Sequence, residues 1–597
     1  MANYHAPLDE MRFIIQDVVG LEPITALPGC EDVMPDLVDA ILEEAGKLGA
    51  EVLAPINHSG DEQGCSLENG VVRTPEGFPE AYRQYVEGGW NGLAADVEFG
   101  GQGLPWLIST AVSEVWHASN MAFGLCPMLT QGAVELLGAH GSADLKAVYM
   151  EKMVSGEWTG TMNLTEPQAG SDLGRVRTKA VPEDNHYRIS GTKIFITHGD
   201  HDMADNIIHM VLARTPDAPE GVRGISLFVV PKFMVNEDGI PSERNDLRCV
   251  SLEHKLGINA SPTAVMSFGD DGGAIGYLVG EENHGLAYMF TMMNNERLAV
   301  GLQGIGVGER AYQHARDFAR ERIQSRKIDG DSAEPVAIIE HPDVKRMLMS
   351  MRSQTEATRA LAYYVGGQLD IACRHPDIET RQASQSLVDL LTPVVKAWGS
   401  DTSIEVASTG IQVHGGMGFI EETGAAQFYR DARITAIYEG TNGIQANDLI
   451  GRKIGRENGE TAKVLIGLIR DFLDSAKSND DEDLAVLCEA LTEAVTALET
   501  ATNWVCETWK SDVAAVAAGA VPYLRLLGLV GGGWMMARSA EISIGSLSKG
   551  NGDPTFHRTK IMSARFFADH FLTEAPGLAR SVTNGWTSVS AAAADQF

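Results

Sequence analysis

Cysteine is scarce in this sequence, and the few cysteines form no paired motif. The seven cysteines among 597 residues are odd in number and widely scattered, and no C-x-x-C pair occurs. They indicate neither a disulfide framework nor a zinc site, and we expect no metal. The positions are Cys30, Cys65, Cys126, Cys249, Cys373, Cys488 and Cys506.

The first residues also lack the features of an export signal. MANYHAPLDEMRF (residues 1–13) has acidic residues where a secretory signal has a basic region and an apolar run. Together with the unpaired cysteines, this favours a reducing compartment, and we expect the cytoplasm.

Positively charged residues are also scarce in this sequence. The chain has 47 Lys and Arg against 81 Asp and Glu, so its formal net charge is −34. This balance argues against broad contact with nucleic acid and against electrostatic docking to anionic lipid. We therefore expect no nucleic-acid partner and no membrane association.

Phosphate-binding loops are missing as well. No G-x-x-x-x-G-K-[ST] motif occurs, so phosphoryl transfer has no support. GLQGIGVGER (residues 301–310) is rich in glycine, but it lies in a helical pattern and lacks the G-x-G-x-x-G spacing of a dinucleotide site. We expect these glycines to allow close helix packing.

What is present is a chain long enough for several domains, with a change of period along it. Amphipathic helical stretches dominate residues 30–155, with a glycine-rich turn at 97–105. Short runs rich in Ile, Val, Phe and Thr follow from about 160 to 270, namely YRISGTKIFIT, NIIHMVLAR, GISLFVVPK and TAVMSF. The helical period returns after 285, where Ala311, Ala315, Ala319 and Ile323 recur on one predicted face.

These patterns predict an α+β fold with a compact central β domain between helical domains. The predicted limits are 1–158 for an N-terminal helical domain with a short extension, 159–278 for the β domain, 279–458 for a helical bundle, and 459–597 for an additional C-terminal helical domain.

Two stretches of the last domain have alternative interpretations. The acidic stretch at 475–483 predicts a solvated linker or a helix start. The apolar stretch at 513–537 contains Pro522, Arg525 and three consecutive glycines, which argue against a single membrane span. We expect buried helices there, with an interfacial membrane patch as the alternative.

Five loops carry most of the chemical information: NLTEPQAGSD (163–172), KIFITHG (193–199), ERIQ (321–324), IQVHGGMGF (411–419) and YEGTNG (438–443). Together they resemble the acyl-CoA dehydrogenase family. The resemblance covers about residues 50 to 455, in the family's order of helical, β-barrel and helical domains. It implies an FAD enzyme that forms a double bond between the α and β carbons of an acyl-CoA thioester.

Glu439 stands at the position of the family's catalytic base. The α proton of a thioester is weakly acidic, so its removal needs a carboxylate with a raised pKa in a pocket that excludes water. The resemblance implies that the backbone N–H of Glu439 and a flavin hydroxyl stabilise the enolate oxygen. We expect Glu439 in an extended turn flanked by glycine, with Tyr438 and Gly440 beside the substrate.

A second carboxylate, Glu296, stands where a minority of the family places its base on a helix. Two carboxylates facing one α carbon would repel each other, and one would stay protonated. We therefore expect Glu439 to be the base and Glu296 to be an alternative base, a pocket wall or a salt-bridge partner. Arg297 is expected to contact the substrate.

The resemblance also implies the cofactor contacts. Leu164 and Thr165 are expected at the flavin ring, and Gly170 and Ser171 at the diphosphate or pantetheine, where Ser171 would also bind substrate. Phe195 is expected to pack on the ring and Thr197 to approach N5. The remaining expected FAD contacts are Arg322, Gln324, His341, Gln412, Gly415, Gly416 and Thr441.

Some of these contacts imply a partner subunit. In the family, the counterparts of Arg322 and Gln324 reach the FAD of a neighbouring subunit, and those of Gln412, Gly415 and Gly416 form the facing loop. We therefore expect at least a homodimer. Ser325 replaces the family's usual aromatic, and residues 331–339 look inserted before His341.

The length of the chain resembles the enlarged bacterial members of the family. We expect oxidation of a medium- to long-chain fatty acyl-CoA in β-oxidation, with electrons passed to an electron-transferring flavoprotein. The alternative substrate is 3-methylmercaptopropionyl-CoA, in which sulfur replaces a methylene. Two further alternatives are an oxidase that releases peroxide and a non-catalytic DNA-binding flavoprotein, although residues 456–597 hold 12 Lys and Arg against 18 Asp and Glu.

Overall fold

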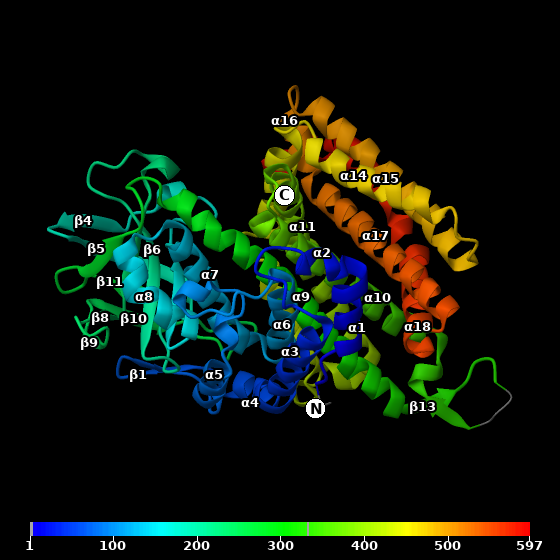
Figure 1. Ribbon diagram of the computed structural model, residues 1–597, viewed down its shortest axis with the longest axis horizontal. Helices are drawn as coiled ribbons and strands as arrows, with labels where there is room; N and C mark the ends of the chain where they lie inside the picture. Colours follow the sequence, from blue (N-terminus) through cyan, green and yellow to red (C-terminus); the bar gives the residue numbers. More distant parts are fainter. Residues whose placement is uncertain (1–3, 331–333, 597) are drawn as a thin grey trace. The chain divides into compact units, whose positions relative to one another are not determined.

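The chain divides into two compact units, each built from segments distant in sequence. The structure is a computed structural model that describes residues 4–330 and 334–596 (Figure 1). The helical unit comprises Met1–Glu43, Pro105–Glu114 and Val300–Phe597, and the sheet unit comprises Glu44–Leu104 and Val115–Ala299. The predicted succession of helical, β and helical segments is confirmed, whereas the four domain limits stay predictions.

The sheet unit is built on eight paired strands. They are β3 (Trp158–Asn163), β4 (Lys179–Glu183), β5 (His186–Thr197), β6 (Asn206–Ala213), β7 (Ser226–Pro231), β10 (Leu247–Leu252), β11 (Thr263–Phe268) and β12 (Ala274–Leu278). The strand order is β10-β11-β5-β12-β7-β6-β3, with β4 beside β5. The four strand runs predicted from the sequence are all present. β5 is the longest strand and pairs with three others, so it organises the sheet.

Helices and two small hairpins complete the sheet unit. The helices are α4 (Pro55–Gln63), α5 (Phe78–Glu87), α7 (Met121–His140) and α8 (Ala143–Ser155), and the hairpins are β1–β2 (Ser66–Glu68, Val71–Arg73) and β8–β9 (Phe233–Val235, Pro241–Arg244). The predicted glycine-rich turn contains η4 (Val97–Phe99). Three helices have residues in both units: α3 (Pro35–Leu48), α6 (Trp106–Ser119) and α9 (Gly285–Glu321).

One helix in the described part of the chain is long and apolar enough to cross a membrane. It is α7, and 83% of its most apolar window is buried inside the fold. Its packing on β3 is close, because a Cβ at Gly160 would lie 2.5 Å from the Cβ of Ala133. Such burial is typical of the core helix of a folded domain.

The helical unit consists of long helices and short turns. Its helices are α1 (Leu8–Phe13), α2 (Glu22–Thr25), α10 (Pro342–Arg374), α11 (Ile378–His414), α12 (Ala425–Thr435), α13 (Asn442–Asp448), α14 (Glu460–Ala476), α15 (Glu482–Thr508), α16 (Val513–Ala518), α17 (Ala520–Lys549), α18 (Pro554–His570), α19 (Ala575–Asn584) and α20 (Trp586–Ser590). A hairpin, β13–β14 (Ile323–Arg326, Pro335–Ala337), follows α9. The predicted linker at 475–483 joins α14 to α15, with Asp481 capping α15.

The predicted apolar face of α9 ends earlier than expected. Ala311, Ala315 and Ala319 are buried, but Ile323 is 59% exposed. The prediction for Ile323 was wrong because α9 ends at Glu321 and Ile323 begins β13. Part of the predicted insertion, residues 331–333, lies outside the described residues.

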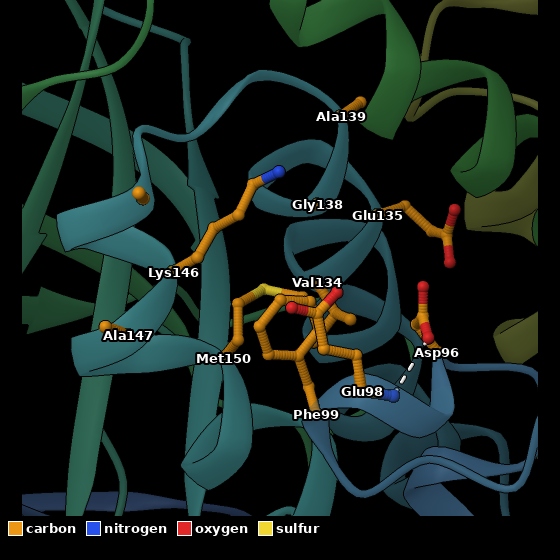
Figure 2. Close-up of a pocket in the computed structure, with 11 residues that line it drawn as sticks. Asp96, Glu98, Phe99, Val134, Glu135, Gly138, Ala139, Lys146, Ala147 and Met150 are labelled. Atoms are coloured by element: carbon orange, nitrogen blue, oxygen red, sulfur yellow. Dashed lines mark hydrogen bonds between the residues drawn. The ribbon is translucent and has the colours of Figure 1, made fainter.

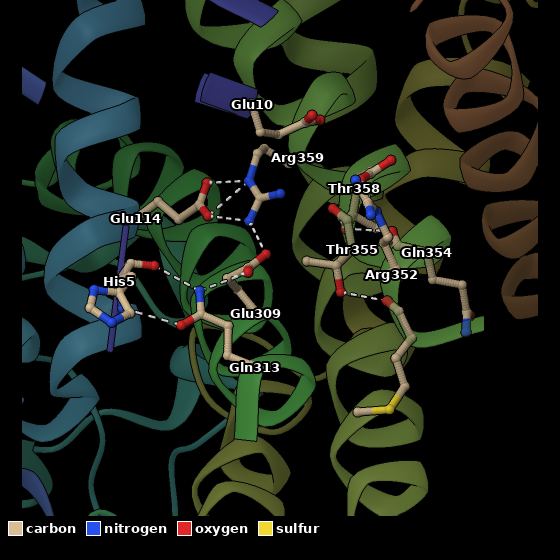
Figure 3. A network of polar contacts seen from close by, with 12 residues as sticks. His5, Glu10, Glu114, Glu309, Gln313, Arg352, Gln354, Thr355, Thr358 and Arg359 are labelled. Atoms are coloured by element: carbon tan, nitrogen blue, oxygen red, sulfur yellow. Dashed lines mark hydrogen bonds and ion pairs between the residues drawn. The ribbon is translucent and has the colours of Figure 1, made fainter. Parts of the chain in front are cut away.

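Buried ion pairs join helices within the helical unit (Figure 3). Arg359 of α10 donates to Glu114 at 2.7 Å and to Glu309 at 2.7 Å, and Tyr363 donates its hydroxyl to Glu114 at 2.8 Å. Because the guanidinium and the Glu114 carboxylate are almost fully buried, each charge depends on the other for solvation.

A second buried pair ties the two ends of the chain to the bundle. Lys560 of α18 donates to Glu10 of α1 at 2.6 Å and to Glu356 of α10 at 3.0 Å. The additional C-terminal helices are therefore anchored to both α1 and α10.

The apolar stretch at 513–537 forms α16 and most of α17, as expected for buried helices. Pro522 lies in the first turn of α17, where a missing N–H is tolerated, and the glycines lie inside the helix. A Cβ at Gly528 or Gly532 would lie 2.6 Å or 2.3 Å from the ring of Trp398 on α11. The same holds in α9, where a Cβ at Gly304 would lie 2.6 Å from the carbonyl oxygen of Gly399. The close helix packing predicted for the glycines of α9 is confirmed at Gly304.

Gly532→Ala is expected to destabilise the protein by about 1–3 kcal/mol, because the new methyl would overlap Trp398. Gly545→Ala in the same helix is the matched control. Its Cβ would enter open space, and the better helix propensity should stabilise the protein by about 0.5–1 kcal/mol. Urea unfolding of both variants measures the difference, and equal midpoints would contradict the close packing.

Candidate active site

The end of strand β5 presents Phe195 through a β-bulge. The pairing with β11 shifts register between Ala264 and Met266, so that β5 has an additional residue there. Phe195 has a φ of +59° and is 59% exposed, although Ile196 next to it is buried. Bulges re-aim side chains in this way. An exposed aromatic in a strained turn suits stacking against a planar ring.

The same bulge connects β5 to the loop after β3. The N–H of Ile194 donates to the carbonyl oxygen of Thr165 at 2.9 Å instead of to a neighbouring strand. Leu164 is buried, whereas Gly170 and Ser171 are exposed. Glu166 and Ala169 exchange backbone hydrogen bonds of 2.9 Å, which close the loop. The structure thus brings Leu164 and Thr165 together with the Phe195–Thr197 segment.

A buried ion pair fixes this arrangement. Lys193 of β5 donates to the Glu166 carboxylate at 2.8 Å and to the carbonyl oxygen of Leu164 at 2.9 Å. The other hydrogen bonds to the carboxylate come from the Thr178 N–H and hydroxyl, the Arg177 N–H and the Gln168 side chain. The Glu166 carboxylate therefore organises both predicted flavin loops, although no role was predicted for Glu166 or Lys193.

The pKa values follow from this environment. Burial would raise the pKa of Glu166, but Lys193 and the hydrogen bonds lower it to about 2. Burial lowers the pKa of Lys193 to about 8, against the effect of Glu166. Since the pKa of Glu166 is below its ordinary value of about 4.3, ionised Glu166 stabilises the fold at neutral pH. That contribution is lost as the pH falls from about 4 toward 2.

Glu439 lies in the loop between α12 and α13 and is half-buried. Its φ is +55°, so the prediction of an extended conformation was wrong; the following Gly440 has a φ of +81°. Left-handed backbone at a residue other than glycine costs about 1–3 kcal/mol and persists only where the surroundings impose it. Phe195 shares this feature, so two of the five predicted loops contain it, and Ser325 shows it directly after a third.

Hydrogen bonds on both sides impose the conformation of the Glu439 loop. The carbonyl oxygen of Glu439 accepts from Gln445 Nε2 at 3.0 Å, and that of Gly440 accepts from Lys396 Nζ at 2.9 Å. Before Glu439, the Tyr438 hydroxyl donates to Gln303 of α9. After it, Thr441 caps α13 by accepting from the Ile444 N–H.

Glu296 and Arg297 belong to the sheet unit, whereas Glu439 belongs to the helical unit. Glu296 is 1% exposed on α9 and faces α7. A Cβ at Gly132 would lie 2.4 Å from Glu296 Oε1, so only glycine leaves room for this carboxylate. Arg297 is buried, with its guanidinium 6.0 Å from the centre of the Phe290 ring.

The expected FAD contacts of the helical unit form two groups. Arg322 donates to Gln324 Oε1 at 3.1 Å, and His341 Nε2 lies 2.7 Å from the carbonyl oxygen of Gln324, so the structure brings these three together. Gln412 is exposed on the last turn of α11. Gly415 and Gly416 follow it, with open space around both.

A cavity of about 580 Å³ lies elsewhere in the sheet unit, among η4, α7 and α8 (Figure 2). Asp96, Glu98 and Glu135 line it together with Lys146. Burial, and then the charge of Asp96, raise the pKa of Glu135 to about 7. None of the predicted site residues lines this cavity.

One trio among the described residues has the spacing of a metal site. Ligand atoms of Cys126, His198 and His201 lie within 4.8 Å of one another. Nδ1 of His201 accepts the Met203 N–H at 3.1 Å, and Nε2 lies 2.9 Å from the Thr159 hydroxyl. Since both nitrogens of His201 are used in hydrogen bonds, we interpret the trio as part of the packed core.

Lys193→Met is expected to release flavin and to destabilise the sheet unit by about 3–5 kcal/mol, because Glu166 would be buried without its cation. Flavin absorbance per chain after gel filtration and urea unfolding measure both effects. Lys152→Met is the control, since Lys152 pairs with Glu157 on the surface and should cost less than about 1 kcal/mol. Wild-type flavin content in Lys193→Met would contradict the role of the pair.

Comparison with known proteins covers nearly the whole chain. Family models match residues 39–157 (acyl-CoA dehydrogenase, N-terminal domain), 161–270 (middle domain), 283–454 (C-terminal domain) and 465–593 (acetyl-CoA dehydrogenase C-terminal like). The last match accounts for the additional helices α14 to α20.

Individual relatives agree with the family models. The chain is 50% identical to 3-methylmercaptopropionyl-CoA dehydrogenase of Ruegeria pomeroyi, over 96% of both chains. It is 33% identical to the broad-specificity linear acyl-CoA dehydrogenase FadE5 of Mycobacterium tuberculosis, again over 96% of both. An acyl-CoA dehydrogenase of Bacillus anthracis, solved in complex with FAD, shares the fold with a TM-score of 0.75 and 20% identity, over 94% of this chain and 90% of that one. The chain therefore belongs to the acyl-CoA dehydrogenase family of FAD-dependent oxidoreductases.

Proposed function

We propose that the protein removes hydrogen from the α and β carbons of an acyl-CoA thioester, with Glu439 as the base that takes the α proton. The observation that carries this proposal is the loop of Glu439. A carboxylate at a left-handed, half-buried position is held there by hydrogen bonds from Gln445 and Lys396 to the loop backbone. Such strain suits a residue whose position matters more than its contribution to stability.

The loop geometry suits proton abstraction. The carbonyl oxygens of Glu439 and Gly440 are both held by donors of the protein, so this backbone cannot rotate freely. The Cα from which the carboxylate extends is thereby held, and so is the backbone N–H of Glu439, which would donate to the developing enolate oxygen. A base and a donor on one held backbone segment lower the barrier because that backbone does not need to reorganise during the reaction.

The residues of the predicted flavin loops fit FAD. Phe195 offers an exposed ring face, and Gly170, Gly415 and Gly416 leave open space where a large group can approach the backbone. Leu164, Thr165, Phe195 and Thr197 would hold the ring, and Gly170 and Ser171 the diphosphate side. When bound, FAD accepts the hydride that leaves the β carbon.

The substrate that we propose is 3-methylmercaptopropionyl-CoA. Its support is the 50% identity, over 96% of both chains, to a dehydrogenase named for that substrate. A medium- to long-chain fatty acyl-CoA is the second candidate, supported by the 33% identity to a linear acyl-CoA dehydrogenase over the same share. The two candidate substrates differ in chain length and in the sulfur that replaces a methylene. Both are acyl-CoA thioesters, so the proposed reaction is the same for both.

We further propose an electron-transferring flavoprotein as the electron acceptor and a homodimer as the smallest assembly. Support for the dimer comes from apolar side chains exposed in the segments predicted to reach a neighbouring subunit. Phe419 is 86% exposed and Met417 52%, beside Gly415 and Gly416, and Ile323 is 59% exposed between Arg322 and Gln324. Large apolar side chains exposed in both segments are typical of an interface.

Anaerobic titration with saturated acyl-CoAs from C4 to C18 and with 3-methylmercaptopropionyl-CoA tests the reaction and the substrate together. We expect the flavin absorbance to bleach most completely with 3-methylmercaptopropionyl-CoA. Preferential bleaching by C8 to C18 chains would favour the fatty acyl candidate. A flavin that no thioester bleaches would contradict the reaction, and peroxide release in air would contradict the proposed electron acceptor.

Phe419→Asp is expected to weaken the dimer, because it places a charge in the exposed apolar segment. Sedimentation velocity should give at least twice the mass of one chain for the wild type and a smaller mass for the variant. The control Val464→Asp changes another exposed apolar side chain, on α14, and should keep the wild-type mass. A wild-type mass equal to one chain would contradict the dimer.

A further inference from the structure

We propose that Lys396 is a positioning residue for Glu439, so that removing its ammonium slows proton abstraction without weakening substrate binding. This inference rests on the proposed role of Glu439 as the base. In this role the buried lysine of α11 takes no part in the chemical step itself. It acts through the loop that carries Glu439.

The first observation is the place of Lys396. It lies within α11 in the sequence LLTPVVKAWGS and is fully buried, among neighbours that are mostly apolar. An ammonium group is rarely buried so completely unless it is paired or hydrogen-bonded. Its partners therefore show what the lysine is for.

The ammonium donates to the loop that carries Glu439 and to the start of the helix that follows this loop. Nζ donates to the carbonyl oxygen of Gly440 at 2.9 Å and to Oδ1 of Asn442 at 2.9 Å. The first acceptor is the peptide oxygen of the residue that directly follows Glu439. The second belongs to the first residue of α13, so the lysine holds both the loop and the helix start that follows it.

The orientation of Asn442 is itself fixed by α11. Its Nδ2 donates to Asp401 Oδ1 at 2.7 Å and to the carbonyl oxygen of Ala397 at 3.2 Å. These bonds turn Oδ1 toward Lys396. The contacts on Asn442 and Gly440 thus form one connected network between α11 and the loop.

The loop needs this network because its conformation is unfavourable by itself. Two consecutive residues, Glu439 and Gly440, have positive φ, and only one of them is a glycine. Hydrogen bonds to an ionised donor are shorter and stronger than neutral ones, so an ammonium holds the Gly440 carbonyl more firmly than an amide would. Without Lys396, the peptide between Gly440 and Thr441 gains freedom to rotate, and the backbone of Glu439 directly before it is held less firmly.

A simpler alternative is that Lys396 only stabilises the bundle. The two alternatives differ in what happens to enzyme that is folded and loaded with FAD. A stabilising lysine changes the amount of such enzyme, whereas a positioning lysine changes the rate per loaded enzyme molecule at saturating substrate.

The test is Lys396→Met, followed by stopped-flow flavin bleaching under anaerobic conditions with the acyl-CoA that best bleaches the wild type. We expect the limiting rate per bound flavin to fall by roughly 10- to 100-fold, the usual consequence of a misplaced catalytic group. The acyl-CoA Kd from the same titration is expected to stay within about two-fold. Lys453→Met is the matched control, because Lys453 also contacts α11, through Asp389 at 3.2 Å, but not the loop. It should keep the wild-type rate.

An unchanged limiting rate in Lys396→Met would overturn the proposal, and so would a rise in Kd that accounts for the whole loss. If Lys396→Met does not fold, Asn442→Ala removes the second acceptor from a partly exposed position and should lower the limiting rate by a smaller factor. A wild-type rate in that variant would then overturn the proposal. Failure of the proposed function itself is recognised separately, because no acyl-CoA would then bleach the wild type.

Discussion

The hydrogen bond from a buried lysine ammonium to a loop carbonyl is the interaction on which both predicted functional regions depend. In the sheet unit, Lys193 donates to Leu164 at 2.9 Å, and in the helical unit Lys396 donates to Gly440 at 2.9 Å. Both lysines lie on regular elements and are fully buried, and both acceptors lie in loops. In each unit, a rigid element thus dictates the backbone of a segment that could not hold its conformation alone.

The strained residues lie where these contacts act. Phe195 follows Lys193 by two residues, and Glu439 precedes Gly440 directly. Positive φ at such residues costs free energy, which the buried hydrogen bonds offset. The buried charge of Lys193 is itself compensated. The Glu166 carboxylate pairs with its ammonium, so that the lysine can hold the loop without leaving an unpaired buried charge.

The additional C-terminal helices contribute as well, since Trp398, two residues after Lys396, packs against Gly528 and Gly532 of α17. They support the helix that holds the Glu439 loop.

Much of this organisation could be predicted from the sequence, because periodicity reports burial directly. The strand runs and the glycine-dependent helix packing follow from local patterns, and the loop motifs could be recognised by resemblance. The limit at Ile323 could not be predicted, because the apolar repeat continues past the point where the helix ends. The left-handed conformation of Glu439 was also missed, since it depends on contacts from α11 that are distant in sequence. Lys193 and Lys396 did leave a signal: each is the one charged residue in a largely apolar run, KIFIT and LLTPVVKAWG. When the sequence pattern predicts that a position is buried and a single charged residue occupies it, that side chain needs a specific hydrogen-bond or ion-pair partner.

Two carboxylates compete for the central role, and they differ in their surroundings. Glu439 sits in a strained, half-buried loop of the helical unit, whereas Glu296 is buried on α9 against Gly132 in the sheet unit. The most direct measurement compares Glu439→Gln and Glu296→Gln, each loaded with FAD and mixed anaerobically with the acyl-CoA that bleaches the wild type. We expect Glu439→Gln to retain its flavin but not to bleach, and Glu296→Gln to bleach. Bleaching that persists in Glu439→Gln and is lost in Glu296→Gln would contradict the assignment of Glu439 as the base.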